Sequence, residues 1–343
     1  MKRVVLILGA IIVFALIPIL AAANNEDELS ASQFDIIADA ADEYLNDPDT
    51  TFNISSFDLL SNMLSGDPYI LSVRSYDDYI TGHIPGAVSM STTELFKPED
   101  LAKLPKDKKI YVYCYTGHTG SQVAALLNIS GYDATNLTWG IMGWTKDTSV
   151  ATKQFSNPST DLPTETTANE LTTTYDLPIL APATSTDEAE IIQAACDTYA
   201  NTDDWNIKAS DLYDLLYDSD LSNDPIVISV RNAEDYAKGH IKGAVNISFK
   251  DIAKVENLQK LDPTKQIVVY CYTGRSGSQA TAILNVLGYD AINLTWGISG
   301  WTTDPDIASK RFSPDTSVDY PFEAGAGEGE PSSPDGGGGG TCG

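Results

Sequence analysis

The sequence predicts an α/β protein of two similar domains, each a parallel sheet with helices on both faces. Short runs of β-branched and aromatic residues alternate with stretches of helical periodicity, which is typical of parallel sheets. The pattern then repeats without a gap: residues 71–155 match residues 228–312 at a constant offset, the one that separates Cys114 from Cys271. With 343 residues, the chain is long enough to form two hydrophobic cores.

An apolar segment opens the chain. Residues 4–23 carry no charge and follow Lys2 and Arg3, which predicts a secretory signal peptide over residues 1–23 that ends at small residues. A run of about 20 apolar residues also suffices for one membrane span, so an N-terminal membrane anchor is the alternative. We therefore expect an extracytoplasmic location, whether periplasmic, secreted or at the cell surface.

The charge balance excludes several classes of partner. The chain has 21 basic and 48 acidic residues, a formal net charge of −27. Such acidity argues against binding to nucleic acid, and against membrane attachment unless the N-terminal segment is uncleaved. The four cysteines (114, 196, 271 and 342) contain no CxxC pair and do not resemble a disulfide framework. We expect neither a metal nor a cofactor.

The first repeat contains the following expected elements, in chain order: a helix over 31–46, a short helix from 56, a strand over 68–73, a helical turn over 76–79, a tight turn over 82–88, a helix and polar loop over 92–107, a strand that ends at Cys114, a helix that ends near 131, a strand over 134–138 and a closing helix from 139. The second repeat follows in register. Cys196 and the four tryptophans at 139, 144, 296 and 301 are expected in the core, and His83 and His240 are expected to stabilise turns by hydrogen bonds.

Composition marks the domain boundaries. The first domain is expected over residues 31–155 and the second over 189–320. Between them, residues 156–188 are rich in Thr, Ser and Pro and predict an extended linker, whose cleavage should release two folded halves. Residues 321–343 are rich in glycine and predict a disordered, dispensable tail.

A cysteine loop recurs in both repeats. In the second repeat, Cys271 follows the strand at 267–270, and a loop to Gly277 precedes a helix expected to begin near Ser278. Small residues leave backbone N–H groups free to bind an anion, and the start of the helix favours a thiolate. Cys114 begins the same loop in the first repeat, so the sequence predicts two equivalent sites.

Three motifs resemble those of the rhodanese family of sulfurtransferases. They are Ser-Val-Arg-x-x-x-Asp-Tyr-x-x-Gly-His-Ile-x-Gly-Ala-Val at 72–88 and 229–245, the Tyr-Cys-Tyr-Thr-Gly loops, and Asn-Leu-Thr-Trp-Gly-Ile-x-Gly-Trp at 136–144 and 293–301. The resemblance implies a five-stranded parallel sheet in each domain. It also implies that Cys271 and Cys114 are catalytic, each accepting a sulfane sulfur as a persulfide and passing it on.

The same resemblance indicates the residues that surround the substrate. In the second loop they are Tyr272, Thr273, Gly274, Arg275, Ser276 and Gly277, and in the first loop they are Tyr115, Thr116, Gly117, His118, Thr119 and Gly120. Arg74 and Arg231 are expected to form ion pairs beneath the sites, with a secondary role in attracting substrate.

The loops depart from the family pattern, which places an arginine five residues after the cysteine. Here that position holds Ser276 and Thr119, while Arg275 lies one residue earlier and His118 is its counterpart. Because Arg275 is a permanent cation and His118 is charged only below about pH 6.5, Cys271 is expected to be the faster site. The difference should narrow towards pH 6.

Three functions follow from these patterns. The first is an enzyme that moves sulfane sulfur from thiosulfate or polysulfide to cyanide or a thiol. The second is a module that carries persulfide with little turnover. The third, a phosphatase or arsenate reductase, is disfavoured because the loop is shorter than in the phosphatase relatives and lacks their closing arginine. The sequence leaves open the physiological donor and acceptor, the oligomeric state and the role of Cys342.

Overall fold

The computed structural model describes residues 33–155, 161–181 and 185–326. The segment expected to be a signal peptide or an anchor lies outside these ranges, as does Cys342. Within the described ranges, no helix is both long and apolar enough to cross a membrane. The described residues comprise both repeats, most of their connection and the segment that follows the second repeat.

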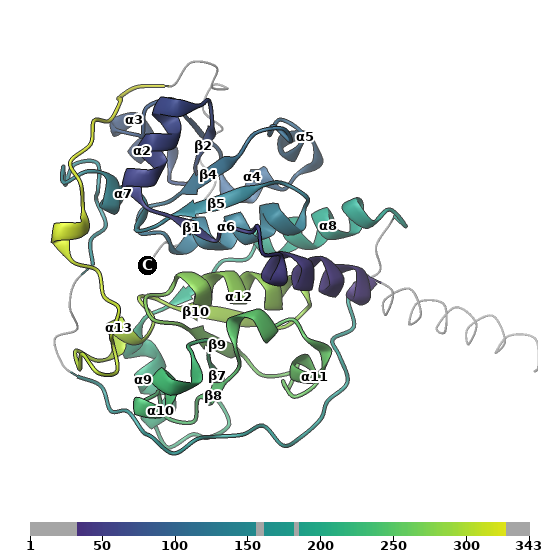
Figure 1. Cartoon of the computed structure of the whole chain (residues 1–343). Helices are drawn as coiled ribbons and strands as arrows, with labels where there is room; N and C mark the ends of the chain where they lie inside the picture. Colours follow the sequence, from purple (N-terminus) through teal and green to yellow (C-terminus); the bar gives the residue numbers. More distant parts are fainter. Residues whose placement is uncertain (1–32, 156–160, 182–184, 327–343) are drawn as a thin grey trace, which may run out of the picture.

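Each repeat forms a five-stranded sheet in which all strand pairs are parallel, which confirms the predicted fold class. The strand orders, β1-β5-β4-β2-β3 and β6-β10-β9-β7-β8, are equivalent (Figure 1). The first sheet contains β1 (Asn53–Ile54), β2 (Tyr69–Ser72), β3 (Ala87–Ser89), β4 (Ile110–Tyr113) and β5 (Ala134–Leu137). The second contains β6 (Asn206–Ile207), β7 (Ile226–Ser229), β8 (Val245–Asn246), β9 (Ile267–Tyr270) and β10 (Ala291–Leu294).

Helices cover both faces of each sheet. The first repeat has a helix over residues 33–46, then α2 (Ser56–Ser65), α3 (Tyr76–Thr81), α4 (Thr92–Leu95), α5 (Pro98–Leu101), α6 (His118–Ile129) and α7 (Gly140–Trp144). The second has α8 (Glu188–Ala200), α9 (Ala209–Tyr217), α10 (Ala233–Lys238), α11 (Val255–Leu258), α12 (Arg275–Val286) and α13 (Ile298–Trp301), with 3₁₀ turns η1 (Phe249–Asp251) and η2 (Pro314–Thr316). Polar side chains begin several helices: Ser55, Ser75 and Asn232 accept a backbone N–H in the first turn of α2, α3 and α10.

The central strands β4 and β9 are buried along their whole length. Because side chains alternate across a sheet, Ile110 and Val112 enter a core shared with α6, whereas Tyr111 and Tyr113 enter an outer core with α2, α3 and α7. Cys114, directly after β4, belongs to the inner core. A continuous apolar run is therefore what a strand with both faces covered requires.

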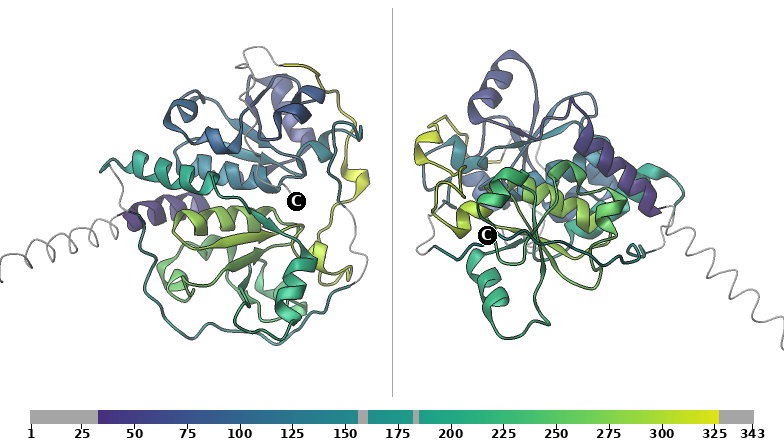
Figure 2. Two further views of the ribbon diagram at one scale, coloured as in Figure 1. Left: turned by 180° about the vertical axis from the view of Figure 1, so that it is seen from behind. Right: turned by 60° about the horizontal axis from the view of Figure 1, so that its bottom comes forward.

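The two repeats share one central hydrophobic core. Helix α6 packs along α12 between the two sheets (Figures 1 and 2), and buried residues of both helices belong to a single apolar cluster. Except for Asn128, every residue of α6 is buried. A helix that is buried on all sides needs cover from both repeats. The shared core argues against the expectation that cleavage of the linker releases two folded halves, because that expectation treated each repeat as complete by itself.

The first helix of each repeat also contacts the other repeat. Helix α8, from the second repeat by sequence, packs against α4 of the first as well as against α12. In turn, Asn46 at the end of the helix over 33–46 donates to the Lys250 carbonyl at 3.1 Å, and Phe52 packs edge-on against Phe249 with ring centroids 5.1 Å apart. Cys196 is fully buried in α8, as expected for a core cysteine.

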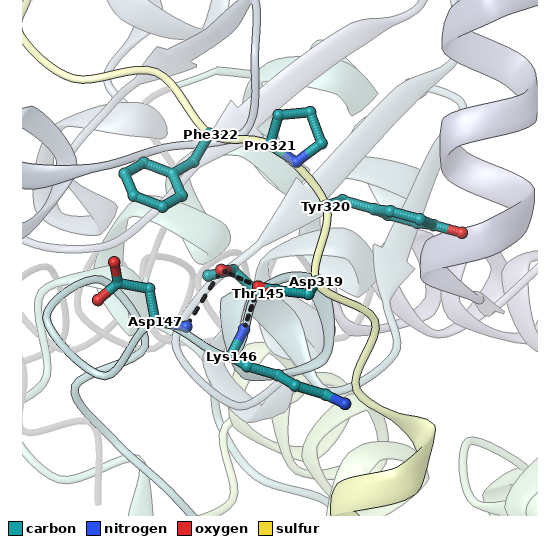
Figure 3. A pocket seen from close by; sticks show the side chains of 7 residues that line it. All are labelled: Thr145, Lys146, Asp147, Asp319, Tyr320, Pro321 and Phe322. Carbon is teal, nitrogen blue, oxygen red and sulfur yellow. Dashed lines mark hydrogen bonds between the residues drawn. The ribbon is translucent and has the colours of Figure 1, made fainter.

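Two extended segments are exchanged between the repeats. Residues 161–169 follow the first repeat but pack on the second, where Trp301 Nε1 donates to the Pro163 carbonyl at 2.9 Å. Residues 317–325 follow the second repeat but pack on the first, where Trp144 Nε1 donates to the Pro321 carbonyl at 2.9 Å. We call these the connecting segment and the C-terminal segment. Figure 3 shows the C-terminal segment beside Thr145 on the first repeat.

The exchanged segments refine the predicted linker and correct the predicted tail. The connecting segment contains no helix, as a linker predicts, yet it lies along the second repeat instead of extending freely. The tail was expected to be disordered from residue 321, but Phe322 packs against the outer core of the first repeat and Glu323 exchanges two backbone hydrogen bonds with His83. Composition alone misled here, because the packed residues directly precede the glycine-rich stretch.

Candidate active site

Each candidate nucleophile lies at the carboxyl end of the central strand of its sheet. Cys114 follows β4 and Cys271 follows β9, and both side chains are buried, with exposed fractions of 1% and 3%. The Cys114 sulfur accepts the Gly117 N–H at 3.1 Å, and the Cys271 sulfur accepts the Gly274 N–H at the same distance. These bonds favour negative charge on the sulfur.

The two glycines make the turn from strand to helix. Gly117 and Gly274 have φ angles of 90° and 89°, in the left-handed region that glycine tolerates best. They let α6 and α12 begin at His118 and Arg275, three residues earlier than the Ser278 start expected from the sequence for α12. The cysteine loops are therefore very short, and the N-terminus of a 12-residue helix follows each thiol.

The opposite wall of each site is a tryptophan–glycine pair. Trp139 and Trp296 are the described non-glycine residues with positive φ, 67° and 64°. A Cβ atom on Gly140, which follows Trp139, would lie 2.4 Å from the Cys114 carbonyl oxygen, so only glycine allows this approach. Both tryptophans are partly exposed and were wrongly assigned to the core; the glycine after each was the signal that the chain passes close to the cysteine loop.

The two loops meet across the interface between the repeats. His118 of the first loop places Nε2 3.1 Å from the Thr273 carbonyl oxygen of the second. The ring meets Trp296 edge-on, with centroids 4.7 Å apart. On the other side, Nδ1 lies 2.9 Å from the Thr116 hydroxyl. His118 therefore joins the two loops.

Burial keeps His118 uncharged. Desolvation lowers the pKa of His118 from 6.5 to about 4, and nearby Arg275 acts in the same direction. The expectation that His118 supplies a positive charge near pH 6 is wrong, because the side chain is enclosed between the two loops. Cys114 consequently has no cation at this position across the neutral range.

Arg275 occupies the equivalent position and also crosses the interface. Its guanidinium carbon lies 4.1 Å from the centre of the Trp139 ring of the first repeat. Burial lowers the pKa of Arg275 to about 10, and the charge of Cys271 opposes this effect, so the guanidinium remains protonated at neutral pH. Its Nη1 atom is buried and has no hydrogen-bond partner among the residues that the structure describes. A partly buried cation, whose Nη1 atom has no described partner, thus adjoins the Cys271 loop.

Arg74 and Arg231 form no ion pair with the described acidic residues, contrary to expectation. Arg74 donates to the carbonyl oxygens of Gly82 and, at 3.2 Å, of Val150. Arg231 makes the equivalent bonds to Gly239 at 2.6 Å and to Ile307 at 3.2 Å. Both side chains are buried, and their guanidinium groups contact Tyr113 and Tyr270, the last residues of the central strands. They brace the structure beneath the loops through main-chain acceptors.

The other candidate residues line or support the loops. The Tyr115 and Tyr272 hydroxyls donate to Asp78 and Asp235, and burial raises the pKa of each phenol to about 12, which keeps both neutral. Lys153 and Lys310 lie over these rings, 4.5 and 4.2 Å from the centroids, and were missed because they lie far along the chain from the loops. The remaining candidates lie in the loops or in the first helical turn: Thr116, Thr273, Thr119, Ser276, Gly120 and Gly277.

Comparison with known proteins places the chain in a family. The model of the rhodanese-like domain matches residues 56–147 and 208–304, which together exceed half of the chain. The chain therefore belongs to the rhodanese-like domain family, with two copies of the domain.

Several relatives carry sulfurtransferase names. Thiosulfate sulfurtransferase PspE from Escherichia coli (strain K12) is 34% identical over 71 residues, which cover 21% of this chain and 68% of that protein. Thiosulfate sulfurtransferase GlpE from Pseudomonas fluorescens is 34% identical over 79 residues, covering 23% of this chain and 71% of that protein. The tRNA sulfurtransferase of Desulfurococcus amylolyticus is 35% identical over 78 residues, but the match covers 23% of this chain and only 15% of that protein.

A solved structure also matches part of the chain. A rhodanese-like domain protein from Staphylococcus aureus is 26% identical, and the match covers 28% of this chain and 94% of that chain with a TM-score of 0.26.

Proposed function

We propose that this protein is a sulfurtransferase in which Cys271, and to a lesser extent Cys114, carries sulfur as a persulfide. A thiolate attacks the outer sulfur of thiosulfate, the S–S bond breaks, and sulfite leaves with the bonding electrons. Cyanide or a thiolate acceptor then attacks the terminal sulfur of the persulfide, which releases thiocyanate or a new persulfide and restores the cysteine thiolate. No net oxidation occurs over the cycle.

One observation carries the proposal: in both repeats, a cysteine sulfur is fixed by a glycine N–H at the start of a buried helix. The N–H groups and the helix N-terminus favour the thiolate that must attack the donor. Family membership and relatives named as thiosulfate sulfurtransferases support the same chemistry.

A persulfide carrier is the second candidate, and burial favours it. Both thiols are almost inaccessible, which would protect a bound sulfur and slow its transfer to large acceptors. Intact-mass measurement after treatment with thiosulfate tests both functions. A sulfur adduct that cyanide removes supports the enzyme, whereas an adduct that resists cyanide supports the carrier. Absence of any adduct on the full chain contradicts both.

We also propose that the protein is exported, on the basis of the uncharged segment at residues 4–23. Mass spectrometry of the protein from a secreting host tests this. Loss of about the first 23 residues supports a signal peptide, and a full-length, membrane-associated product supports the anchor.

A further inference from the structure

Arg275 combines three properties that are seldom found together in a side chain. It is charged at neutral pH, its Nη1 atom is buried without a hydrogen-bond partner in the described part of the chain, and it lies close enough to Cys271 for the two charges to interact. Leaving a buried guanidinium N–H unpaired is costly, unless a ligand pairs with it during function. The group that fits is an anion bound beside the Cys271 sulfur.

The other repeat holds this side chain in place. The guanidinium stacks over the Trp139 ring at 4.1 Å, and no described hydrogen bond of the side chain competes with that contact. Trp139 is itself constrained, because its backbone is left-handed and the next residue, Gly140, packs directly against Cys114. The Cys114 loop of the first repeat thus fixes the ring on which the cation of the second repeat rests.

The equivalent contact, between His118 of the first repeat and Trp296 of the second, does not supply a charge. His118 meets Trp296 edge-on and remains neutral, since its pKa is lowered to about 4. The two cross-repeat contacts are similar in position but differ in chemistry. Of these two contacts, the Arg275–Trp139 stack is the one that presents a cation to a sulfur donor, and it does so in a chain whose net charge of −27 repels anions.

We propose that Trp139 is a positioning residue that completes the Cys271 site from the first repeat, by holding Arg275 so that Nη1 binds an anionic sulfur donor such as thiosulfate. This inference rests on the proposed sulfur transfer at Cys271. It predicts that the site distinguishes anionic from neutral sulfane-sulfur donors, and that a residue outside its own repeat determines that preference.

The test uses the full chain with Cys114→Ser, so that only Cys271 reacts, and adds Trp139→Ala, Trp139→Phe or Arg275→Ala. Steady-state rates at pH 8 compare thiosulfate with an uncharged organic trisulfide. We expect Trp139→Ala to raise KM for thiosulfate about tenfold, as loss of a buried cation–π contact implies, with little change in kcat or in KM for the trisulfide. Trp139→Phe should restore most of the affinity. The double variant Trp139→Ala with Arg275→Ala should be no worse than Arg275→Ala alone.

Phe155→Ala is the matched control. Phe155 also reaches from the first repeat across the interface, where it packs edge-on against Trp296 with centroids 4.9 Å apart, but it does not stack on Arg275. Its loss should leave the KM for thiosulfate unchanged. The inference would be overturned if Trp139→Ala raised KM equally for both donors, or if it left KM for thiosulfate unchanged.

Binding separates this inference from the proposed function. Calorimetry with thiosulfate on the variant that lacks both active-site thiols (Cys114→Ser, Cys271→Ser) measures the anion site without turnover. We expect Trp139→Ala to weaken this binding about tenfold. If the Cys114→Ser protein transfers no sulfur but Trp139→Ala still weakens thiosulfate binding, the proposed transfer at Cys271 fails and the role of Trp139 stands. If the Cys114→Ser protein transfers sulfur and Trp139→Ala leaves the affinity for thiosulfate intact, the proposed function stands and the role of Trp139 fails.

Discussion

His118 and Arg275 occupy equivalent positions, each the first residue of the helix that follows a cysteine, and each contacts the opposite repeat. Burial acts on both by disfavouring the charged form. Histidine loses its proton under this influence, because its ordinary pKa is close to neutral, whereas arginine remains charged. One substitution in a duplicated loop thus makes two nearly identical sites electrostatically different.

The first prediction concerns which cysteine transfers sulfur faster. We expect Cys271→Ser to reduce thiosulfate:cyanide activity at least about fivefold more than Cys114→Ser at pH 8, because the Cys271 loop has the permanent cation Arg275 at the position that neutral His118 occupies in the Cys114 loop, and this cation stabilises the anionic donor. The ratio should stay constant from pH 8 to pH 6, since His118 remains neutral throughout that range. Steady-state rates of both single variants test this. A larger loss in Cys114→Ser, or a ratio that approaches one at pH 6, would contradict it.

The second prediction concerns acid stability. The pKa of His118 is about 4 in the folded protein and about 6.5 when unfolded, so the unfolded state binds more protons between these values. The protein should therefore lose stability as the pH falls from 6.5 to 4, by roughly 3 kcal/mol from this group. Denaturant unfolding of wild type and His118→Gln measures the effect. The variant should have a flatter profile over this window, and parallel profiles would show that His118 does not titrate this way.

The sequence could predict the loop residues of each site but not the residues that the opposite repeat contributes to it. Cys271, the small loop residues and Arg275 are adjacent along the chain, so strand, loop and helix patterns indicated them. The contact between Arg275 and Trp139 depends on how two repeats pack, and a repeat pattern contains no information about that packing. For the same reason, the pKa of His118 was expected to be ordinary.

At the scale of whole elements, the connecting segment and the C-terminal segment bind to the two repeats in the same way. Each contains a similar short motif, Asp161-Leu-Pro-Thr-Glu165 or Asp319-Tyr-Pro-Phe-Glu323. Each motif binds the opposite repeat through equivalent contacts. Glu165 exchanges backbone hydrogen bonds with His240, as Glu323 does with His83. This correspondence was present in the sequence. It was overlooked because the two motifs lie in regions whose composition predicts a linker and a tail.

Truncation tests the C-terminal segment. Deleting residues 321–343 removes the carbonyl that accepts from the buried Trp144, the packing of Phe322 and the Glu323 contacts with His83. We expect a loss of about 1–3 kcal/mol, seen as a fall of about 5 °C in Tm. Deleting residues 327–343 is the control, so that the difference between the two truncations isolates residues 321–326. Equal Tm values for the two would restore the interpretation of a dispensable tail.

At the scale of the whole molecule, the duplication has produced one structural unit. The central core contains residues from α6, α8, α12 and the helix over 33–46, and so draws on both repeats. The sequence predicted each sheet correctly, because hydrophobic periodicity reports which residues are buried. It could not show what covers them, because the apolar residues of α6 have the same pattern whether the helix packs against a partner protein or against a second repeat.

The last prediction follows from this shared core. We expect the protein to remain a single particle after cleavage between the repeats, because separation would expose the apolar faces of α6 and α12 and break the contacts of the C-terminal segment with the first repeat. A specific protease site in place of residues 156–160 keeps the connecting segment attached to the second repeat, on which it packs. Size-exclusion chromatography of the fully cleaved protein, checked by denaturing gel, should show the mass and elution of the uncleaved chain, with thiosulfate:cyanide activity retained. Two stable particles of about half the mass would mean that the repeats are independent domains. In that case, activity at Cys271 should also survive without the first repeat, and the contribution assigned to Trp139 would be lost.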